Sequence, residues 1–528
     1  MKKAFFVAFV LALVVPATAV LAGAKSETAA STGAAQSRPV VFMAYVGHTS
    51  SDAYYQRLHD YIEQQTGVKF TFRDVMTNDD FKVQKTAAIA AQEQIDAFTT
   101  DSTELATNRT KGVIQDITDA VNTYGANMKK LFSNPPGWEG FEPGAMWRAA
   151  TIDGRIWAVP GATGKDVGVV LSVRKDWREK LGVGPIDTID QFEAYLRKVK
   201  GTDLNGNGTA DEIPFNPMYG TDGLEGIAST MVYPFVGAVG WMHEWYMATY
   251  LSGEGQITPT VLHPGFRTFL AKMAQWYKEG LINPDVQTLT WDNDNDLLAA
   301  DRVGATASWY SDFYTAWGSL KEKVPAAEYE HVVLKGPDGA PAKFALFNPA
   351  FAKWSYTSWS PKDVVAAGIK LQDWFAANKD NYLVQWHGVQ GTDWKYLNKG
   401  DVTVRPEIQH ISDPEYESYS FLDYNNWNGF VLGNMDFTKT ATFAANKVLA
   451  TKQAWFPPDW FVAYDWSGTK IKDNYNDAAT FVNEAVANVI LGRASLADWD
   501  KAMVQFREMW ANEFVKVATT QYNAAKGK

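Results

Sequence analysis

The stretch Asp203-Leu204-Asn205-Gly206-Asn207-Gly208-Thr209-Ala210-Asp211-Glu212 places oxygen-bearing groups at alternating positions, followed by Ile213-Pro214-Phe215. Calcium prefers about six to eight oxygen ligands, and an EF-hand loop supplies them from positions 1, 3, 5, 7, 9 and 12. Counted from Asp203, the matching groups are Asp203, Asn205, Asn207, the carbonyl of Thr209, and Asp211. Position 12 is Pro214 instead of the usual Glu, so we expect a shortened loop that Glu212 closes.

The same stretch has a second interpretation, because Asn-Gly sequences form solvated turns without any metal. Five matching positions favour a Ca²⁺ loop over a simple turn. In either case the stretch connects a predicted helix that ends near Lys200 to a strand that begins near Ile213. The sequence therefore predicts a structural clamp at this point of the fold.

The N-terminus has the pattern of a secretory signal peptide. Met1-Lys2-Lys3 precedes an apolar run from Ala4 to Val15, and small residues end at Ala22-Gly23-Ala24. This arrangement predicts a signal peptide over 1–24, cleaved after Ala24 or Ala22. Residues 25–38 are rich in Ser, Thr, Ala and Gly, which predicts a flexible tether. No later run approaches 18 apolar residues, so we expect a soluble periplasmic protein.

Composition narrows the possible functions. The 528 residues contain no Cys, which excludes disulfides, Cys nucleophiles and a lipid-modified Cys. The formal charge is −11, and without Lys2 and Lys3 the chain has 47 basic against 60 acidic residues, so we expect no nucleic-acid partner. Aromatic residues make up 14% of the chain, which suggests that some rings face a ligand although most pack in a core.

Alternating strand and helix patterns in the first hundred residues predict an α/β fold. Strands are expected at 39–45, 68–72 and 95–100, with helices from Asp52 and from Asp79 or Asp80 between them. Such units form a mainly parallel sheet through right-handed crossovers. Ligands of these sheets gather at the carboxyl ends of the strands, here near 47–51 and 99–103.

Later parts of the chain give a second set of elements. Strands are expected at 156–160, 167–173 and 303–309, and Thr188 with Gln191 forms a capping box for a helix that runs to Lys200. An amphipathic helix is predicted at 266–277, and another begins at Ser495. Residues 385–475 show little periodicity, so we expect loops and short strands there.

Several stretches together resemble the extracellular solute-binding proteins of ABC importers, family 1, particularly the large oligosaccharide branch that includes alginate-binding proteins. The clearest are Asp153-Gly154-Arg155-Ile156-Trp157-Ala158-Val159-Pro160, His387-Gly388-Val389-Gln390-Gly391-Thr392-Asp393-Trp394 and Gly492-Arg493-Ala494-Ser495-Leu496-Ala497-Asp498-Trp499. The others are 173–177, 180–215, 276–285 and 302–305. In this order the stretches span most of the chain.

The resemblance implies a two-lobe periplasmic binding protein fold of type II, with the ligand in a cleft between the lobes. We expect the first lobe at 39–165 with a return at 336–380, and the second at 166–335 and 381–528. The resemblance also implies lobe closure on binding and docking to inner-membrane permease subunits; we expect a monomer. In alginate-binding relatives the equivalent loop holds calcium away from the sugar, which maps onto Asp203, Asn205, Asn207, Thr209, Asp211 and Glu212. Many relatives have Cys after Leu-Ala-Gly, whereas this chain has Ala24, which points to a protein without a lipid anchor.

Candidate ligand residues follow from the chemistry of sugars, whose apolar faces stack on aromatic rings. Trp309 and Tyr310 resemble the family position for stacking, with core packing as the alternative. Trp427 lies between amides that suit hydroxyl groups, and core packing is equally open. His48 and Asp101 follow predicted strands, although a helix cap also explains Asp101. Trp241, Trp386 and Trp394 are weaker candidates, for which core or inter-lobe packing is favoured.

The sequence gives few signs of catalysis. His243-Glu244 lacks the second His of a zinc-protease helix, and no Gly-x-Ser-x-Gly or phosphate loop is present. Asp292, Asp294 and Asp296 are better explained as a helix start on a solvated surface. We expect a non-enzymatic binding protein for an oligosaccharide. The alternative is a secreted carbohydrate-active enzyme, because sequence spacing does not reveal paired carboxylates.

Overall fold

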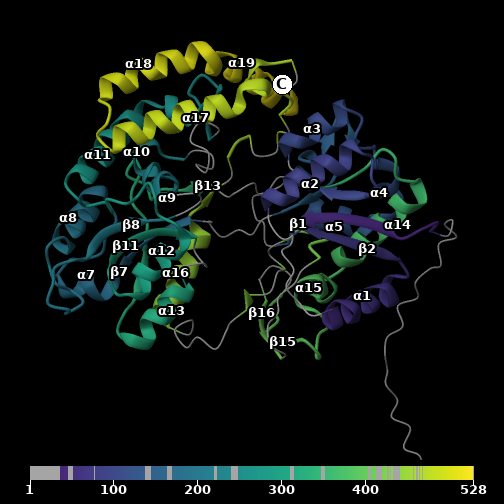
Figure 1. The fold of residues 1–528 in the computed structure, drawn as a ribbon, viewed down its shortest axis with the longest axis horizontal. Helices are drawn as coiled ribbons and strands as arrows, with labels where there is room; N and C mark the ends of the chain where they lie inside the picture. The colour runs from purple at the N-terminus through teal and green to yellow at the C-terminus, as the bar shows by residue number, and fades with distance from the viewer. Residues whose placement is uncertain are drawn as a thin grey trace, which may run out of the picture. The chain divides into compact units, whose positions relative to one another are not determined.

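The computed structural model describes residues 36–526 with gaps (Figure 1). The gaps are 46–51, 76–77, 101, 137–143, 163–168, 219–222, 239–247, 310–313, 346–350, 402–405, 412–418, 425–426, 428–429, 432–439, 456, 460–461, 463 and 467. The expected signal peptide and the tether up to residue 35 therefore lie outside the described residues.

The first sheet has the strand order β2-β1-β3-β14-β6. Its strands are β1 (Val40–Tyr45), β2 (Phe70–Val75), β3 (Ala97–Thr99), β6 (Val159–Gly161) and β14 (Phe351–Tyr356). β1 pairs in parallel with both β2 and β3, as the alternating strand and helix pattern predicts. β14 is antiparallel to β3 and to β6 and returns to this sheet from far along the chain.

The elements around this sheet bury an aromatic core. The Phe42 ring lies 5.2 Å from Trp354 and 4.8 Å from Phe421, both edge to face. The helices are α1 (Asp52–Thr66), α2 (Asn78–Ala90), α3 (Ser102–Thr110), α4 (Thr118–Tyr124), α5 (Ala126–Ser133), α6 (Ala145–Arg148), α14 (Lys362–Ala376) and α15 (Lys379–His387). Small strands are β4 (Thr151–Ile152), β5 (Arg155–Ile156), β15 (Trp394–Asn398), β16 (Glu407–His410) and β17 (Phe430–Val431).

The second sheet has the order β12-β7-β11-β8. Its strands are β7 (Val169–Arg174), β8 (Ile213–Pro217), β11 (Val303–Trp309) and β12 (Tyr329–Val332). β11 is parallel to β8 and antiparallel to β7, and its bounds agree with the strand that the sequence predicts. The metal-loop stretch ends where β8 begins, so its backbone is continuous with this sheet.

Helices packed around the second sheet form, with its strands, the largest hydrophobic core of the described residues. They are α7 (Lys175–Lys180), α8 (Ile189–Val199), α9 (Gly223–Met231), α10 (Tyr233–Val236), η1 (Thr260–Leu262), α11 (Pro264–Lys278), α12 (Trp291–Ala299), α13 (Tyr314–Lys323), α16 (Ala441–Lys452), α17 (Lys470–Ile490), α18 (Leu496–Phe506) and η3 (Arg507–Ala511). The last helix, α19 (Asn512–Ala525), packs in a smaller cluster with Ile257. The remaining strands are β9 (Thr249–Leu251), β10 (Ile257–Pro259), β13 (Phe344–Ala345) and β18 (Ala454–Trp455).

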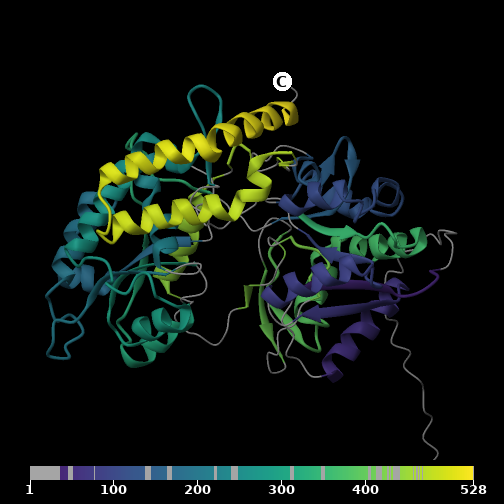
Figure 2. The ribbon, with the colours of Figure 1, turned by 45° about the horizontal axis from the view of Figure 1, so that its top comes forward.

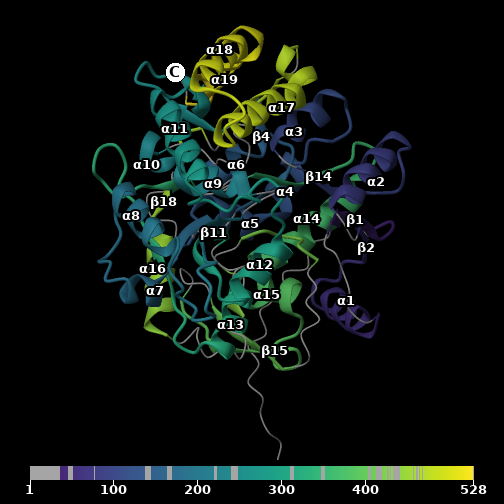
Figure 3. The same ribbon diagram turned by 60° about the vertical axis from the view of Figure 1, so that its left-hand side comes forward.

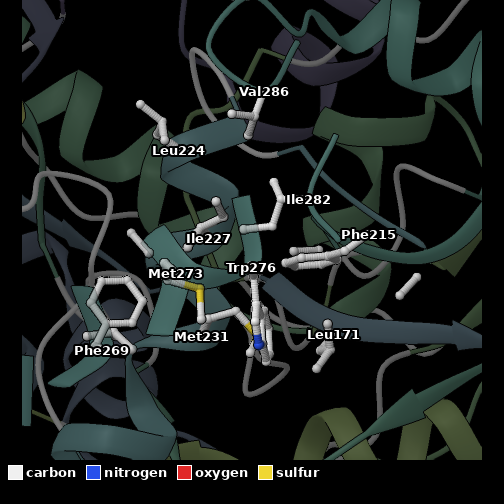
Figure 4. Close-up of a cluster of buried hydrophobic side chains, with 14 of the residues drawn as sticks. Leu171, Phe215, Leu224, Ile227, Met231, Phe269, Met273, Trp276, Ile282 and Val286 are labelled. Atoms are coloured by element: carbon white, nitrogen blue, oxygen red, sulfur yellow. The ribbon is translucent and has the colours of Figure 1, made fainter. Parts of the chain in front are cut away.

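Large side chains from strands and helices meet in this second core. Figure 4 shows Trp276 of α11 close to Phe215 of β8 and Met231 of α9. Helices α17 and α18 belong to the same core, and Phe266 of α11 stacks on Trp499 of α18 with ring centroids 5.5 Å apart. Figures 2 and 3 show α17 and α18, in yellow, running alongside one another.

The expected α/β class is confirmed, with differences in detail. Tyr382, Tyr419, Phe421 and Trp427 are among the residues that pack in the core of the first sheet, whereas the sequence leads us to expect 381–528 in the second lobe. The stretch 385–475 also contains α16 and the start of α17, where the sequence predicts loops and short strands. Both segments make long-range contacts that local periodicity does not reveal. Within the described residues, no helix is long and apolar enough to span a membrane.

Candidate metal loop and candidate ligand residues

Local sequence explains how the metal loop, residues 203–212, is positioned. The predicted capping box is present, since the Thr188 side chain accepts a hydrogen bond from the Gln191 backbone and starts α8. After α8, Gly206 and Gly208 adopt φ values of 78° and 88°, a left-handed conformation that other residues adopt at a cost. These two glycines let the backbone curl tightly before β8 begins.

The oxygens of the loop turn toward its own backbone. Asp203 accepts hydrogen bonds from the N–H groups of Gly206 at 2.7 Å and Gly208 at 2.9 Å. Asn205 Oδ1 accepts from Asn207 N at 2.9 Å, and Asn207 Oδ1 accepts from Thr209 N at 2.7 Å. Such side-chain contacts to the backbone are those of a closed turn network.

The burial and the contacts of the Glu212 carboxylate indicate that the loop can hold a cation. Its Oε1 accepts hydrogen bonds from the backbone N–H groups of Leu204 and Asn205, so the side chain reaches back to the start of the loop. The residue is only 7% exposed, and its Oε2 has no hydrogen-bond partner among the described residues. A buried carboxylate oxygen without a partner is costly, and a bound cation would satisfy it. The donor set therefore fits a hard cation such as Ca²⁺.

The loop's carboxylates alone do not form a metal cluster. No three His, Asp or Glu side chains in the described part of the chain lie close enough together to hold a metal ion. A cation in this loop would therefore depend on the amide oxygens of Asn205 and Asn207 and on the Thr209 carbonyl, in addition to Asp203, Asp211 and Glu212. Calcium commonly takes such mixed oxygen ligands.

The sugar-stacking candidates are only partly described. β11 ends at Trp309, opposite Val169 of β7. Tyr310, His48 and Asp101 lie outside the described residues, as does the weaker candidate Trp241. Their roles in ligand binding stay predictions.

Trp427 lies in the first core. Its side chain is 5% exposed, with ring centroids 5.3 Å from Tyr424 and 6.1 Å from Tyr382. Phe132 links Tyr424 to Trp147 through ring contacts of 6.2 and 6.0 Å. We call these five residues the aromatic cluster. The burial of Trp427 favours its core-packing interpretation, and its contact with a ligand stays a prediction.

Two indole N–H groups attached to the first core are buried and have no acceptor among the described residues. They belong to Trp147 of α6 and Trp386 of α15. A buried Trp usually finds a partner for this group, so each is a candidate donor to a ligand hydroxyl. Trp394 differs, because its indole donates to the Gly388 carbonyl at 2.9 Å and is fully buried. The sequence gives no sign that singles out Trp147.

A buried polar row crosses the second sheet. His331, Ser172, Thr306 and Asn216 are paired across neighbouring strands, and each is at most 4% exposed. At the end of this polar row, Asn216 donates a hydrogen bond to Asp294 of α12. The four residues come from distant parts of the chain, so no sequence motif marks them.

The position of Asp294 contradicts the expectation that the acidic start of this helix lies on a solvated surface. Its side chain is fully buried, and burial raises the pKa of its carboxyl to about 8. Its Oδ2 has no hydrogen-bond partner among the described residues. Thr290 caps α12 instead, by accepting a hydrogen bond from Asn293 N. The periodicity of α12 turns Asp294 toward the sheet.

Comparison with known proteins links this fold to sugar-binding proteins. No family model matches the chain. A curated relative is 24% identical over 289 residues: the fructooligosaccharide ABC transporter substrate-binding protein FusA of Streptococcus pneumoniae serotype 4. The match covers 53% of this chain and about half of that relative, 49%.

Solved structures match over nearly the whole chain. An HMO-binding, ABC-transporter-associated solute-binding protein from Bifidobacterium longum infantis has a TM-score of 0.69 and 18% identity, covering 92% of this chain and 99% of its own. The alginate-binding protein AlgQ2, solved without calcium ion, has a TM-score of 0.67 and 17% identity, covering 92% and 97%. An EF-hand mutant of S. pneumoniae FusA in complex with fructo-nystose has a TM-score of 0.63 and 17% identity, covering 93% and 100%. The predicted resemblance is confirmed: this chain has the two-lobe α/β fold of the solute-binding proteins of ABC transporters.

Proposed function

We propose that this protein is the substrate-binding component of an ABC importer and that it captures an oligosaccharide without altering it. The observation that carries the proposal is the match over 92% of this chain to an HMO-binding solute-binding protein associated with an ABC transporter. The partial sequence match to the fructooligosaccharide-binding FusA supports the same substrate class. Delivery requires a membrane permease as partner, and capture takes place outside the cytoplasm, as a monomer.

The ligand site is proposed at the aromatic residues Trp309 and Tyr310, with His48 and Asp101 as polar contacts. The aromatic cluster adds one donor that the sequence does not indicate, because the indole N–H of Trp147 is buried and has no acceptor among the described residues. Aromatic faces and a few fixed polar groups are what a sugar site requires.

A screen of neutral and acidic oligosaccharides by thermal shift tests this function. A binding sugar raises the melting temperature by mass action and changes Trp fluorescence. The recovered sugar should be intact by mass spectrometry. New reducing ends or unsaturated products would instead support the carbohydrate-active enzyme, and no response to any glycan would contradict the proposal.

Substitution of Trp by Phe distinguishes the contribution of the indole N–H from that of the aromatic ring. In Trp147→Phe and Trp386→Phe the aromatic face stays while the donor is lost, so a lost hydrogen bond to a sugar should weaken binding by about 0.5–1.5 kcal/mol. Trp394→Phe is the matched control, since its N–H bonds the Gly388 carbonyl. Sugar affinity should be unchanged in the control. Equal affinities in all three variants would remove the two donors from the site.

We further propose that residues 203–212 hold a structural Ca²⁺. The buried Glu212 Oε2 supports this proposal, as do the calcium-free AlgQ2 and EF-hand mutant FusA structures with the same fold. Bound calcium would anchor the start of β8 to the end of α8. Chelation should then lower the melting temperature and leave sugar affinity nearly unchanged.

The calcium proposal has a matched pair of variants. Asp203→Ala removes a proposed ligand, so adding calcium should no longer raise the melting temperature. Asp477→Ala removes an exposed carboxylate from α17 and should keep the full calcium response. If chelation abolishes sugar binding and leaves the melting temperature unchanged, the structural role is wrong.

A further inference from the structure

Arg302 lies immediately before β11 and beside the end of the metal loop. Its carbonyl accepts a hydrogen bond from Ile213 N at 2.8 Å, which ties it to the first residue of β8. Val303 and Ile213 are paired in the parallel register of the sheet. The backbone of Arg302 is therefore fixed next to the two residues, Asp211 and Glu212, that close the loop.

The Arg302 guanidinium contacts Asp211 twice. Its Nη2 donates to the Asp211 carbonyl at 2.9 Å and lies 3.2 Å from the carboxylate oxygen Oδ2. Asn207 donates to the other carboxylate oxygen, Oδ1, at 3.1 Å. Both oxygens of Asp211 are thus directed at protein donors, and one of these donors carries a positive charge.

Asp211 occupies position 9 of the EF-hand-like spacing, so the same carboxylate is a proposed ligand of the cation. A guanidinium on this oxygen and a divalent ion at the loop centre repel each other and compete for one acceptor. The pair is only partly exposed, at 36% for each side chain, so water screens the repulsion incompletely.

We propose that Arg302 is a built-in counter-ion of the metal loop: it neutralises Asp211 when no cation is bound and weakens cation binding by its charge. This inference rests on the calcium loop proposed above. The loop would then keep its shape without metal and would bind calcium less tightly than its carboxylate count suggests. Arg302 is a tuning residue in this scheme and not a calcium ligand.

The test compares Arg302→Gln with Arg302→Lys in the full-length protein. Gln keeps a hydrogen-bond donor without the charge, and Lys keeps the charge without the planar fork. By calorimetry at low salt, Arg302→Gln should bind calcium on the order of tenfold more tightly than the unchanged protein. Arg302→Lys should stay within about threefold, and salt of ~0.5 M should reduce the gain of the Gln variant.

A second readout needs no calcium. In the presence of chelator, Arg302→Gln should melt ~1 °C lower than the unchanged protein, because Asp211 loses its counter-ion. Arg267→Gln is the control, since it breaks an exposed ion pair with Asp500 outside the loop and keeps the same change in net charge. Its calcium affinity should match that of the unchanged protein.

The outcomes separate this inference from the calcium proposal. If the unchanged protein binds no calcium and Asp203→Ala changes nothing, the calcium loop fails and the role of Arg302 fails with it. If calcium binds and Asp203→Ala weakens it, but Arg302→Gln binds equally or more weakly, only the role of Arg302 is overturned. In that case Arg302 would position Asp211 for the ion.

Discussion

Two buried aspartates, one in each core, are held in opposite ways. Asp96 in the first core and Asp294 in the second are both fully buried. Asp96 accepts hydrogen bonds from both terminal nitrogens of Arg38, at 2.6 and 2.7 Å, and further ones from Val41 N and Ser360 Oγ. Hydrogen bonding to Asp96 in turn raises the pKa of Arg38.

The Asp294 side chain accepts fewer hydrogen bonds than the Asp96 side chain does. Asn216 donates a hydrogen bond to one of its carboxylate oxygens, and the other oxygen has no hydrogen-bond partner among the described residues. With a pKa of about 8, this carboxyl is mostly protonated at pH 7, whereas Asp96 sits in a shell of donors that suits a carboxylate. The same residue type thus pairs with a guanidinium in the first core and is a protonated carboxyl in the second core. The difference follows from the donors nearby and not from burial.

The largest expected effect comes from Asp96→Asn. The amide turns one acceptor oxygen into a donor that faces Arg38 or Val41 N, and it removes the charge that balances Arg38. Loss of one partner of a buried pair typically costs about 3–5 kcal/mol, and partial exposure of Arg38 places this case near the lower figure. Urea denaturation at pH 7 measures the loss. A change in the free energy of unfolding below ~1 kcal/mol would contradict the difference between the two aspartates, because it would mean that the first core does not depend on the pairing of Asp96 with Arg38.

Asp294→Asn is the matched substitution in the second core and acts through pH. In the folded state Asp294 stays protonated up to pH about 8, whereas in the unfolded chain it ionises near 3.8. The folded state therefore binds more protons between these values, and stability falls as pH rises from about 4 to 8. Asn should remove up to ~1.4 kcal/mol per pH unit of this slope. Melting temperatures of both proteins from pH 5 to 8 give the comparison, and parallel curves would contradict it.

His331, at the other end of the polar row, should give the opposite trend. Burial lowers its pKa to about 3, so the folded state keeps it neutral while the unfolded chain protonates near 6.5. Stability is fully present above pH 6.5 and falls as pH drops toward 3. His331→Gln should flatten the loss between pH 6.5 and 5 by up to roughly 2 kcal/mol. Acid titration followed by circular dichroism measures this loss of stability. If the variant loses as much stability in acid as the unchanged protein does, His331 is not neutral in the folded state.

Thr290→Ala gives the smallest expected effect and asks what holds α12 in place. The Thr290 side chain caps this helix, and such a cap is typically worth about 1 kcal/mol. If the cap and Asp294 act independently, the costs of Thr290→Ala and Asp294→Asn should add in the double variant. A marked departure from additivity in urea titrations would show that the contact of Asp294 with Asn216 depends on the cap.

Elements with local signals could be predicted from the sequence. The capping box of Thr188 and Gln191 and the strand over 303–309 depend on residues close in the chain, and both are present. The start of α17, by contrast, is rich in Lys, Asp and Asn, which hides its helical periodicity. Its apolar face becomes evident from Val482 and Val486, which pack in the second core.

The sequence by itself determined the α/β class, the parallel start of the first sheet and the spacing of oxygens from Asp203 to Glu212. These features are local, because strand, helix and loop patterns repeat over a few residues. Only the tertiary structure decided that Trp427 is buried, that Asp294 faces the polar row and that Arg302 contacts Asp211. Each of these depends on groups far apart in the chain, whose proximity is set by packing and strand order and is not written in any short stretch.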